Sequence, residues 1–418
     1  MKKYYERILD KILKEELEAF GAVLITGPKW SGKSTTAKKI AKTIVNLQDP
    51  FKKESYINMI DLNPYLILEG EKPLLIDEWQ EAPVLWDAIR HDVDNKNEKG
   101  LYILTGSQKV DSSKISHSGA GRISRILMRT MSLYESKASN GKVSIEDLFK
   151  GAEFEPTRSK LSIEDIANLI VKGGFPSTID ETLSVARKQV RGYMDIIASV
   201  EIFTVDGIKR NSNVMFQVLR SLARNTSTQV TDVSLIKDIE VNNFLIHRNT
   251  LSSYINVLKD LYIIEDLKAW NPKLRSKSAI RTSDTRHFID PSIPANLLDA
   301  GPEDIIRDVN TFGLLFESLV VRDLRVYADF LNGKVFHYRD SSGLEVDSII
   351  HLDNGKWAAI EIKLGTKELD KAAENLIKLK NVVDIKLEPS FLMIITGGEF
   401  AYKRPDGVFV VPIGCLKP

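Results

Sequence analysis

The fold is set by one short segment, Gly27-Pro28-Lys29-Trp30-Ser31-Gly32-Lys33-Ser34, which matches the pattern G-x-x-x-x-G-K-[ST]. Glycines in such a loop let backbone N–H groups wrap a phosphate, and the helix that follows directs further unpaired N–H groups at negative charge. The segment therefore predicts a phosphate-binding loop in which Lys33 neutralises the β- and γ-phosphates and the Ser34 hydroxyl binds Mg²⁺.

The surroundings of this loop predict an α/β fold with a parallel sheet. The apolar run 22–25 precedes the loop as a strand, a helix is predicted over Ser34–Val45, and residues 4–20 have the apolar spacing of an amphipathic helix. Three further short apolar runs, each bounded by turns and predicted as a strand, are Tyr56–Asp61, Leu74–Ile76 and Tyr102–Leu104. Strands that alternate with helices form βαβ units, so we expect one such domain over 1–135.

Two acidic residues follow one of these predicted strands, in Leu74-Leu75-Ile76-Asp77-Glu78. Open α/β sheets bind their ligands at the carboxyl ends of the strands. Asp77 is therefore predicted to hold Mg²⁺ through its water shell, and Glu78 to orient or deprotonate an attacking water.

Polar side chains after a third strand extend the predicted site. In Leu104-Thr105-Gly106-Ser107 the Thr105 hydroxyl is placed to sense a γ-phosphate, although a plain strand-ending turn gives the same pattern. Arg122 and Arg125, in Gly121–Arg125, have no acid near them in the sequence. Arg122 is predicted to stabilise transition-state charge, in its own chain or from a neighbour in a homo-oligomer, and solvated surface arginines are the alternative.

The segments GPKWSGKST, LLIDEWQEAP, ILTGSQ, GR and GGFP resemble the AAA-type ATP-binding proteins common in bacteria and archaea. The similarity covers nearly the whole chain, and it implies a P-loop NTPase sheet with ATP and Mg²⁺ as cofactors. Residue by residue, the resemblance supports Gly27, Gly32, Lys33, Ser34 or Thr35, Asp77 and Glu78 as nucleotide-site positions, with Asp77 as a Mg²⁺ ligand and Glu78 as the catalytic acid–base group. Pro28, Lys29, Trp30, Ser31 and Thr105 are predicted to complete the nucleotide-binding site. Lys29 and Trp30 depart from related loops, which often have a small residue after Arg or Gln, but these positions contribute backbone amides.

Composition limits the possible partners. The 418 residues include 58 Lys and Arg against 57 Asp and Glu, a formal net charge of +1, which excludes a uniformly basic nucleic-acid coat. Cys415 is the only cysteine in the sequence, so there is no disulfide framework. The first residues do not resemble a signal peptide, and no apolar run approaches the roughly 20 residues of a membrane span. We expect a cytoplasmic protein with no membrane partner.

The middle of the chain predicts a helical connector over 136–210 and a winged-helix domain over 211–290. Three helical patterns precede a predicted strand over Tyr262–Leu267, and a second strand ends at Ile289. The third helix, Thr250–Leu258, has an inward apolar stripe and an outward polar face formed by Ser252, Ser253 and Asn256. The segment 268–281 has five basic residues and no acid, namely Lys268, Lys273, Arg275, Lys277 and Arg281. DNA or RNA contact is the prediction, and a protein-contact module or spacer is the alternative.

The last predicted domain, 291–418, has acidic residues on adjacent strands. A helix over Phe312–Tyr327 is followed by strands over Val335–Tyr338, Leu344–His351 and Trp357–Ile362. Asp347 lies on the second of these strands, and Glu361 and Lys363 share one face of the third, because side chains alternate along a strand. The turn 353–355 predicts an antiparallel pair that brings the three together, with Glu317 on the helix as a fourth group.

This arrangement resembles the PD-(D/E)xK nuclease superfamily, which implies a second metal site formed by Glu317, Asp347 and Glu361, with Asp347, Glu361 and Lys363 catalytic. The chain departs from the superfamily pattern because Val346, and not a proline, precedes Asp347. A catalytically silent domain with a surface Glu361–Lys363 pair is the alternative.

Three hypotheses follow. The first is an ATPase that couples its nucleotide state to a nucleic acid, and the second is a metal-dependent nuclease gated by ATP. The third is a nucleotide-dependent binding module with an inert nuclease-like scaffold. A small-molecule kinase is less favoured, because the remaining 280 or so residues do not resemble a substrate lid.

Overall fold

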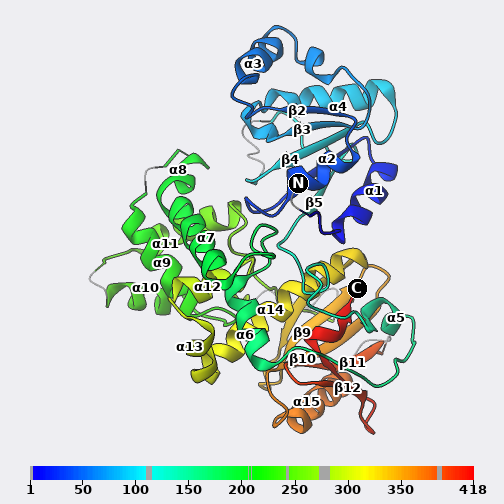
Figure 1. Cartoon of the computed structure of the whole chain (residues 1–418), viewed down its shortest axis with the longest axis vertical. Coiled ribbons are helices and arrows are strands. Elements are labelled where there is room, and N and C mark those ends of the chain that lie inside the picture. Colours follow the sequence, from blue (N-terminus) through cyan, green and yellow to red (C-terminus); the bar gives the residue numbers. More distant parts are fainter. Residues whose placement is uncertain are drawn as a thin grey trace. The chain divides into compact units, whose positions relative to one another are not determined.

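The structure is a computed structural model that describes residues 3–109, 115–205, 207–208, 210–241, 244–272, 283–383 and 388–418. The chain forms two compact units (Figure 1). The N-terminal unit comprises Met1–Arg129 with Asp260–Tyr262, and the C-terminal unit comprises Thr130–Lys259 with Ile263–Pro418. No helix in the described residues is both long and apolar enough to cross a bilayer.

The N-terminal unit contains a parallel sheet with the strand order β2-β3-β4-β1-β5 over its described residues. The strands are β1 (Ala22–Thr26), β2 (Thr43–Asn46), β3 (Leu74–Asp77), β4 (Tyr102–Gly106) and β5 (Ile123–Leu127). The helices are α1 (Leu9–Ala19), α2 (Lys33–Ile40), α3 (Lys53–Leu62) and α4 (Val84–Lys96), with 3-10 turns η1 (Pro64–Leu68) and η2 (Trp79–Glu81). The neighbouring strands β1, β4 and β3 are buried throughout. Because they are parallel, the residues that follow their carboxyl ends meet at one edge of the sheet. The predicted α/β fold with a parallel sheet is confirmed.

Two predicted elements of this unit are wrong. The run Tyr56–Asp61, predicted as a strand, lies within α3, where Tyr56, Ile57 and Met59 pack against the core beside the buried Ile60. The helix predicted over Ser34–Val45 ends at Ile40, and β2 begins at Thr43 to pair with β3. Short apolar runs are compatible with either structure, and the tertiary packing decides between them.

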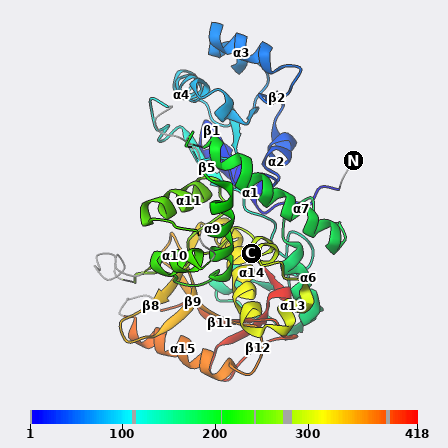
Figure 2. The ribbon, with the colours of Figure 1, turned by 90° about the vertical axis from the view of Figure 1, so that its left-hand side faces the viewer.

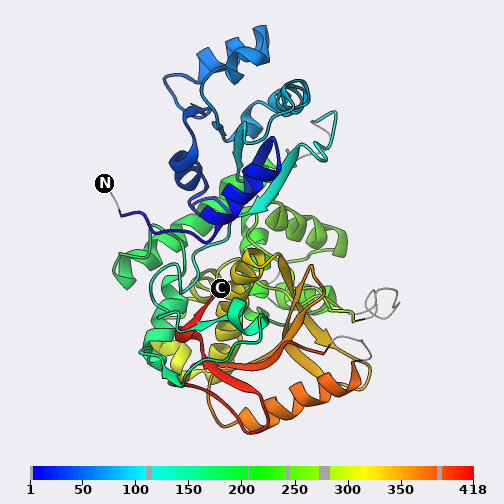
Figure 3. The ribbon, with the colours of Figure 1, turned by 90° about the vertical axis from the view of Figure 1, so that its right-hand side faces the viewer.

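The C-terminal unit is built on a mixed sheet with the order β7-β12-β13-β11-β10-β9-β8 over its described residues. The strands are β7 (Thr157–Arg158), β8 (Gly333–Arg339), β9 (Glu345–Leu352), β10 (Trp357–Lys363), β11 (Phe391–Thr396), β12 (Phe400–Lys403) and β13 (Phe409–Pro412). Strands β8, β9 and β10 are antiparallel neighbours, whereas β10, β11 and β13 are parallel. Helix α14 (Val309–Phe330) and helix α15 (Leu369–Val382) cover opposite faces of this sheet (Figure 3). The predicted helix and its three following strands are confirmed as α14, β8, β9 and β10.

The segment between the two sheets is helical with short strands. Its elements are β6 (Val143–Ser144), which pairs with β14 (Leu416–Lys417), and helices α5 (Ile145–Phe149), α6 (Ile163–Lys172) and α7 (Leu183–Ile196), then the π-helix η4 (Ile197–Glu201) and α8 (Ile202–Thr204). Later in the chain come α12 (Ser292–Leu297), α13 (Pro302–Arg307) and the 3-10 turn η6 (Ile413–Cys415). Residues 136–205, as far as they are described, therefore contain more than the helices predicted for this segment.

Three helices, α9 (Ser212–Arg224), α10 (Asp232–Glu240) and α11 (Arg248–Asp260), lie next to one another (Figure 2). The predicted inward stripe of α11 is buried, but the Ser253 hydroxyl, predicted to face out, accepts a hydrogen bond from Arg210 Nη2 at 3.0 Å. The strand predicted over Tyr262–Leu267 consists of single antiparallel bridges, Ile264↔Phe288 and Leu267↔Thr285, and not a continuous strand. Lys273, Arg275, Lys277 and Arg281 lie outside the described residues.

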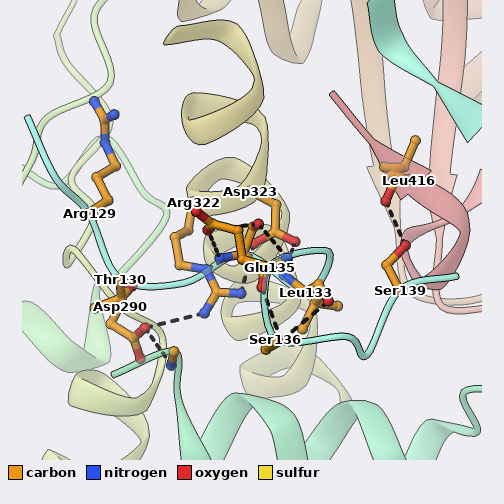
Figure 4. Close-up of polar contacts among 12 residues, drawn as sticks. Arg129, Thr130, Leu133, Glu135, Ser136, Ser139, Asp290, Arg322, Asp323 and Leu416 are labelled. Carbon is orange, nitrogen blue, oxygen red and sulfur yellow. Dashed lines mark hydrogen bonds and ion pairs between the residues drawn. The ribbon is translucent and has the colours of Figure 1, made fainter. Parts of the chain in front are cut away.

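A buried ion cluster ties distant segments of the C-terminal unit together (Figure 4). Arg322, on α14, contacts Asp290 Oδ2 at 3.2 Å and Asp323 Oδ1 at 2.7 Å, and all three side chains are almost completely buried. The second oxygen of Asp323 accepts the backbone N–H of Leu133 at 2.9 Å, and Asp290 Oδ2 accepts that of Gly174 at 2.9 Å. The cluster thus anchors the start of the unit and the 173–176 loop to α14.

Candidate nucleotide site

The phosphate-binding loop connects β1 to α2, as predicted. Gly27 has φ +143°, and a side-chain carbon there would lie 2.3 Å from the carbonyl oxygen of Met128, so only glycine fits. Trp30, the position that departs from related loops, also has a positive φ of 74°. Arg7, which precedes α1, also contacts the loop, because its Nη1 donates to the Ser31 carbonyl oxygen at 2.8 Å.

Lys33 is the first residue of α2 and is buried. Its Nζ donates to the carbonyl oxygens of Gly27 and Pro28 at 3.0 and 2.8 Å. Burial lowers the pKa of Lys33 to about 8, although Glu78 and Asp77 oppose this shift. A buried ammonium that contacts two carbonyl oxygens is well suited to bind an anion, and the phosphates of a nucleotide carry such charge.

Asp77 lies at the end of β3 and gathers polar groups from two other elements. The Ser34 hydroxyl and the Thr105 hydroxyl both donate to Asp77 Oδ1 at 2.6 Å, and Lys38 Nζ lies 3.5 Å from Oδ2. The hydroxyl of Ser34 and the carboxylate of Asp77 are hard oxygen ligands of the kind Mg²⁺ prefers. The arrangement fits the predicted Mg²⁺ site. The Thr105 hydroxyl, predicted as a γ-phosphate sensor, donates to Asp77 and accepts the backbone N–H of Glu78.

Glu78 follows Asp77 in a left-handed backbone conformation, with φ 57° and ψ 54°. Non-glycine residues rarely adopt this conformation, and such strain clusters at functional sites. Glu78 Oε2 accepts hydrogen bonds from Gln80 Nε2 at 2.5 Å and from Ser107 Oγ at 3.3 Å. Because Glu78 raises the pKa of Lys33, its charge acts on the phosphate-binding loop. The structure therefore brings Lys33, Ser34, Asp77, Glu78 and Thr105 together.

Three other predicted residues, Thr35, Arg122 and Arg125, have different surroundings. Thr35 is exposed on α2. Arg122 Nε lies 2.7 Å from Asp94 Oδ1, and this ion pair lowers the pKa of Asp94. Arg125 lies over the Trp86 ring, 5.1 Å from its centroid. No acid lies near Arg122 in the sequence, and Asp94, 28 residues away, reaches it only through the fold.

Three residues of the site were missed by sequence reasoning. Gln80 lies in the segment LLIDEWQEAP and Ser107 in the segment ILTGSQ. Their contacts with Glu78 depend on how the side chains pack after the strands end. Arg7 had no sequence signal, because 24 residues separate it from Ser31.

The predicted acidic pocket of the C-terminal unit also forms in part. The antiparallel register of β9 and β10 extends to Ser348↔Ile360, the residues next to Asp347 and Glu361. Lys363 Nζ lies 3.3 Å from Asp347 Oδ2 and 2.8 Å from Glu361 Oε2, and Asp347 Oδ2 also accepts the backbone N–H of Ile362 at 2.7 Å.

The electrostatics of this pocket are those of crowded carboxylates. Burial, and then the charge of Asp347, raises the pKa of Glu361 to about 8. The same two causes raise the pKa of Glu317 well above its ordinary value, which places Glu317 within electrostatic reach of Asp347. Burial alone would lower the pKa of Lys363, but Asp347 and Glu361 raise it above its ordinary value.

The predicted second metal site does not fit a metal ion as these side chains lie. No group of three or more His, Cys, Asp or Glu side chains among the described residues could hold one. The physical reason is Lys363, whose ammonium contacts both Asp347 and Glu361 and supplies the positive charge that a cation would otherwise bring.

Comparisons with known proteins match the chain in three parts. Residues 19–137 match an AAA domain, and residues 163–304 and 312–416 match two domains of unknown function, DUF8612 and DUF4143. The chain is 22% identical over 409 residues to the uncharacterized proteins Mb2031c of Mycobacterium bovis and Rv2008c of Mycobacterium tuberculosis, covering 96% of this chain and 82% of each relative. A solved structure described as a Walker-type ATPase of Pyrococcus abyssi is 14% identical, covers 70% of this chain and 96% of that one, and has a TM-score of 0.43. The N-terminal unit therefore carries an AAA-type P-loop ATPase domain.

Proposed function

We propose that this protein hydrolyses ATP with Mg²⁺ and couples its nucleotide state to a nucleic acid. The observation that carries the first half is the meeting of Lys33, Asp77 and Glu78 at one edge of the parallel sheet. Phosphoryl transfer needs positioning and charge stabilisation more than covalent chemistry, and these are the groups that supply both.

Each residue has a defined task in this proposal. The loop amides and Lys33 bind the β- and γ-phosphates, while Ser34 and Asp77 would hold Mg²⁺, which when bound neutralises charge on the phosphates. Glu78 takes the proton of a water whose oxygen forms a bond to the γ-phosphorus. The bond from that phosphorus to the bridging oxygen breaks, which leaves ADP and phosphate.

The nucleic-acid half rests on α11 and on the basic segment 268–281. In α11, Asn256 is exposed and Ser252 is half-buried, and both face away from the buried stripe. The order of three helices followed by the bridges Ile264↔Phe288 and Leu267↔Thr285 supports a winged helix. The acid-free run of five basic residues supplies charges that would pair with phosphates.

The test is ATP hydrolysis with and without DNA or RNA. We expect Mg²⁺-dependent phosphate release that Lys33→Ala abolishes, and a rise of at least about threefold with nucleic acid that weakens as salt increases. Changing Lys273, Arg275 and Lys277 together to alanine should remove this stimulation. Hydrolysis that nucleic acid does not change at low salt would disprove the coupling but leave the ATPase, whereas nucleotide binding without any hydrolysis would favour the third hypothesis, a binding module.

A nuclease gated by ATP is the second candidate, and it is supported by the meeting of Asp347, Glu361 and Lys363, the groups that the resemblance to the PD-(D/E)xK nucleases implies, in one pocket. Since Lys363 occupies these carboxylates, a divalent cation would have to displace it from one of them. We expect plasmid or branched DNA to be cleaved with Mn²⁺ or Mg²⁺, and Asp347→Ala and Lys363→Ala each to slow cleavage about a hundredfold.

The matched control is Glu345→Ala, on the same strand as Asp347. Glu345 is half exposed and pairs with Arg339 at 2.9 Å, so its loss should leave cleavage within about twofold. Cleavage that survives both site variants would come from elsewhere, and wild-type protein without cleavage would support an inert scaffold.

A further inference from the structure

The side chain of Gln80 contacts the Glu78 carboxylate directly. Gln80 is the middle residue of η2, two positions after Glu78. Its Nε2 donates to Glu78 Oε2 at 2.5 Å, and Ser107 Oγ, from just beyond β4, donates to the same oxygen at 3.3 Å. Two donors on one oxygen restrict rotation of the carboxylate about its last bond and thereby orient the other oxygen.

The backbone of Glu78 is also fixed by a hydrogen bond. Its N–H donates to Thr105 Oγ1 at 3.1 Å while the residue keeps its left-handed conformation. Glutamate otherwise has many rotamers, so these three hydrogen bonds select one placement of the side chain and hold it before a substrate arrives.

The turn that carries Gln80 has little room to move. Trp79 is buried and packs against Trp86 with ring centroids 5.0 Å apart. Trp79 Nε1 and Gln80 Oε1 are buried beside Gly106, and a side-chain carbon added there would lie 3.0 and 3.1 Å from them. Neither atom has a hydrogen-bond partner among the described residues. A buried polar atom without a hydrogen-bond partner costs free energy, and proteins tolerate this cost where the surrounding packing imposes it, often at functional sites.

We propose that Gln80 is a positioning residue for ATP hydrolysis, which fixes the Glu78 carboxylate toward the phosphate-binding loop with the help of Ser107. This inference rests on the proposed ATPase function. Glu78 directly follows Asp77, whose carboxylate accepts the Ser34 hydroxyl of that loop, so Gln80 holds the Glu78 side chain in the productive direction and does not restrain it away from the substrate. Gln80 itself touches neither nucleotide nor water in this role.

The test is the kinetics of Gln80→Ala. We expect kcat for ATP hydrolysis to fall about tenfold with KM within about twofold, because a misplaced general base slows the chemical step but leaves phosphate binding intact. Gln48→Ala is the matched control. Gln48 is a surface glutamine that donates to Glu81 Oε1 at 3.2 Å, and its removal should leave kcat unchanged.

A double-mutant cycle with Glu78→Gln separates positioning from a structural role. If Gln80 acts through Glu78, adding Gln80→Ala to Glu78→Gln slows hydrolysis less than about twofold further. Gly106→Ala places a methyl group against Gln80 and should lower kcat in the same way. It replaces Gln80→Ala as the test if Gln80→Ala folds poorly. The proposal is overturned by an unchanged or raised kcat in Gln80→Ala, or by an undiminished effect in the Glu78→Gln background. In these cases the ATPase proposal still holds as long as the wild-type protein hydrolyses ATP. A wild-type protein that binds ATP but does not hydrolyse it overturns both the ATPase proposal and the proposed role of Gln80.

Discussion

Replacing Glu78 with glutamine is expected to slow ATP hydrolysis by about a hundredfold to a thousandfold while ATP still binds. The glutamine keeps the size of the side chain but cannot take a proton from water. Lys33, Ser34 and Asp77 remain in place, so the dissociation constant for ATP should change by less than about threefold. Phosphate release measures the first quantity, and calorimetry or a fluorescent nucleotide measures the second.

Glu81→Gln is the matched control for this prediction, because Glu81 belongs to the turn η2 that follows Glu78. Its carboxylate accepts hydrogen bonds from Gln48 at 3.2 Å and from Lys53 at 2.6 Å at the surface, away from Lys33. This exchange should leave the rate within about twofold. A Glu78→Gln protein as fast as the wild type would show that Glu78 is not the catalytic base.

Replacing Arg322 with alanine is expected to lower the free energy of unfolding of the C-terminal unit by about 3–5 kcal/mol. Asp290 and Asp323 lie with Arg322 in a region closed to solvent, so the change leaves two buried carboxylates without their cation. Burial already raises the pKa of Asp323 in spite of Arg322. Urea denaturation followed by circular dichroism would measure the loss as an early transition separate from that of the N-terminal unit.

Arg307→Ala provides the comparison on the surface of the same unit. Arg307 pairs with Glu303 one helical turn away at 3.4 Å, and both side chains are mostly exposed. Such pairs contribute about 0.5 kcal/mol or less. If Arg322→Ala cost no more than Arg307→Ala, the buried cluster would not be what anchors the 130–136 segment and the 173–176 loop.

The parts of this protein that local chemistry specifies were predictable. The phosphate-binding loop needs glycine at Gly27, and the acids Asp77 and Glu78 directly follow an apolar run, so spacing alone identified them. Helix α14 has a long apolar pattern, and β9 and β10 are two mostly apolar runs on either side of the turn 353–355. The strand predicted over Tyr56–Asp61 is wrong, because an apolar run of six residues does not distinguish a strand from one side of a helix.

Residue spacing along the chain predicts the phosphate-binding residues, the strands that end in acids, and the strand faces that Asp347, Glu361 and Lys363 share. Which charged side chains meet depends on how the chain folds in three dimensions. Ser107 reaches Glu78 across 29 residues, Asp290 reaches Arg322 across 32, and Leu133 reaches Asp323 across 190. Lys363 likewise contacts two carboxylates that were expected to hold a metal. The reason is physical: periodicity and turn residues encode local backbone conformation and burial, whereas partners among buried charges are selected by sheet order and helix packing over the whole unit.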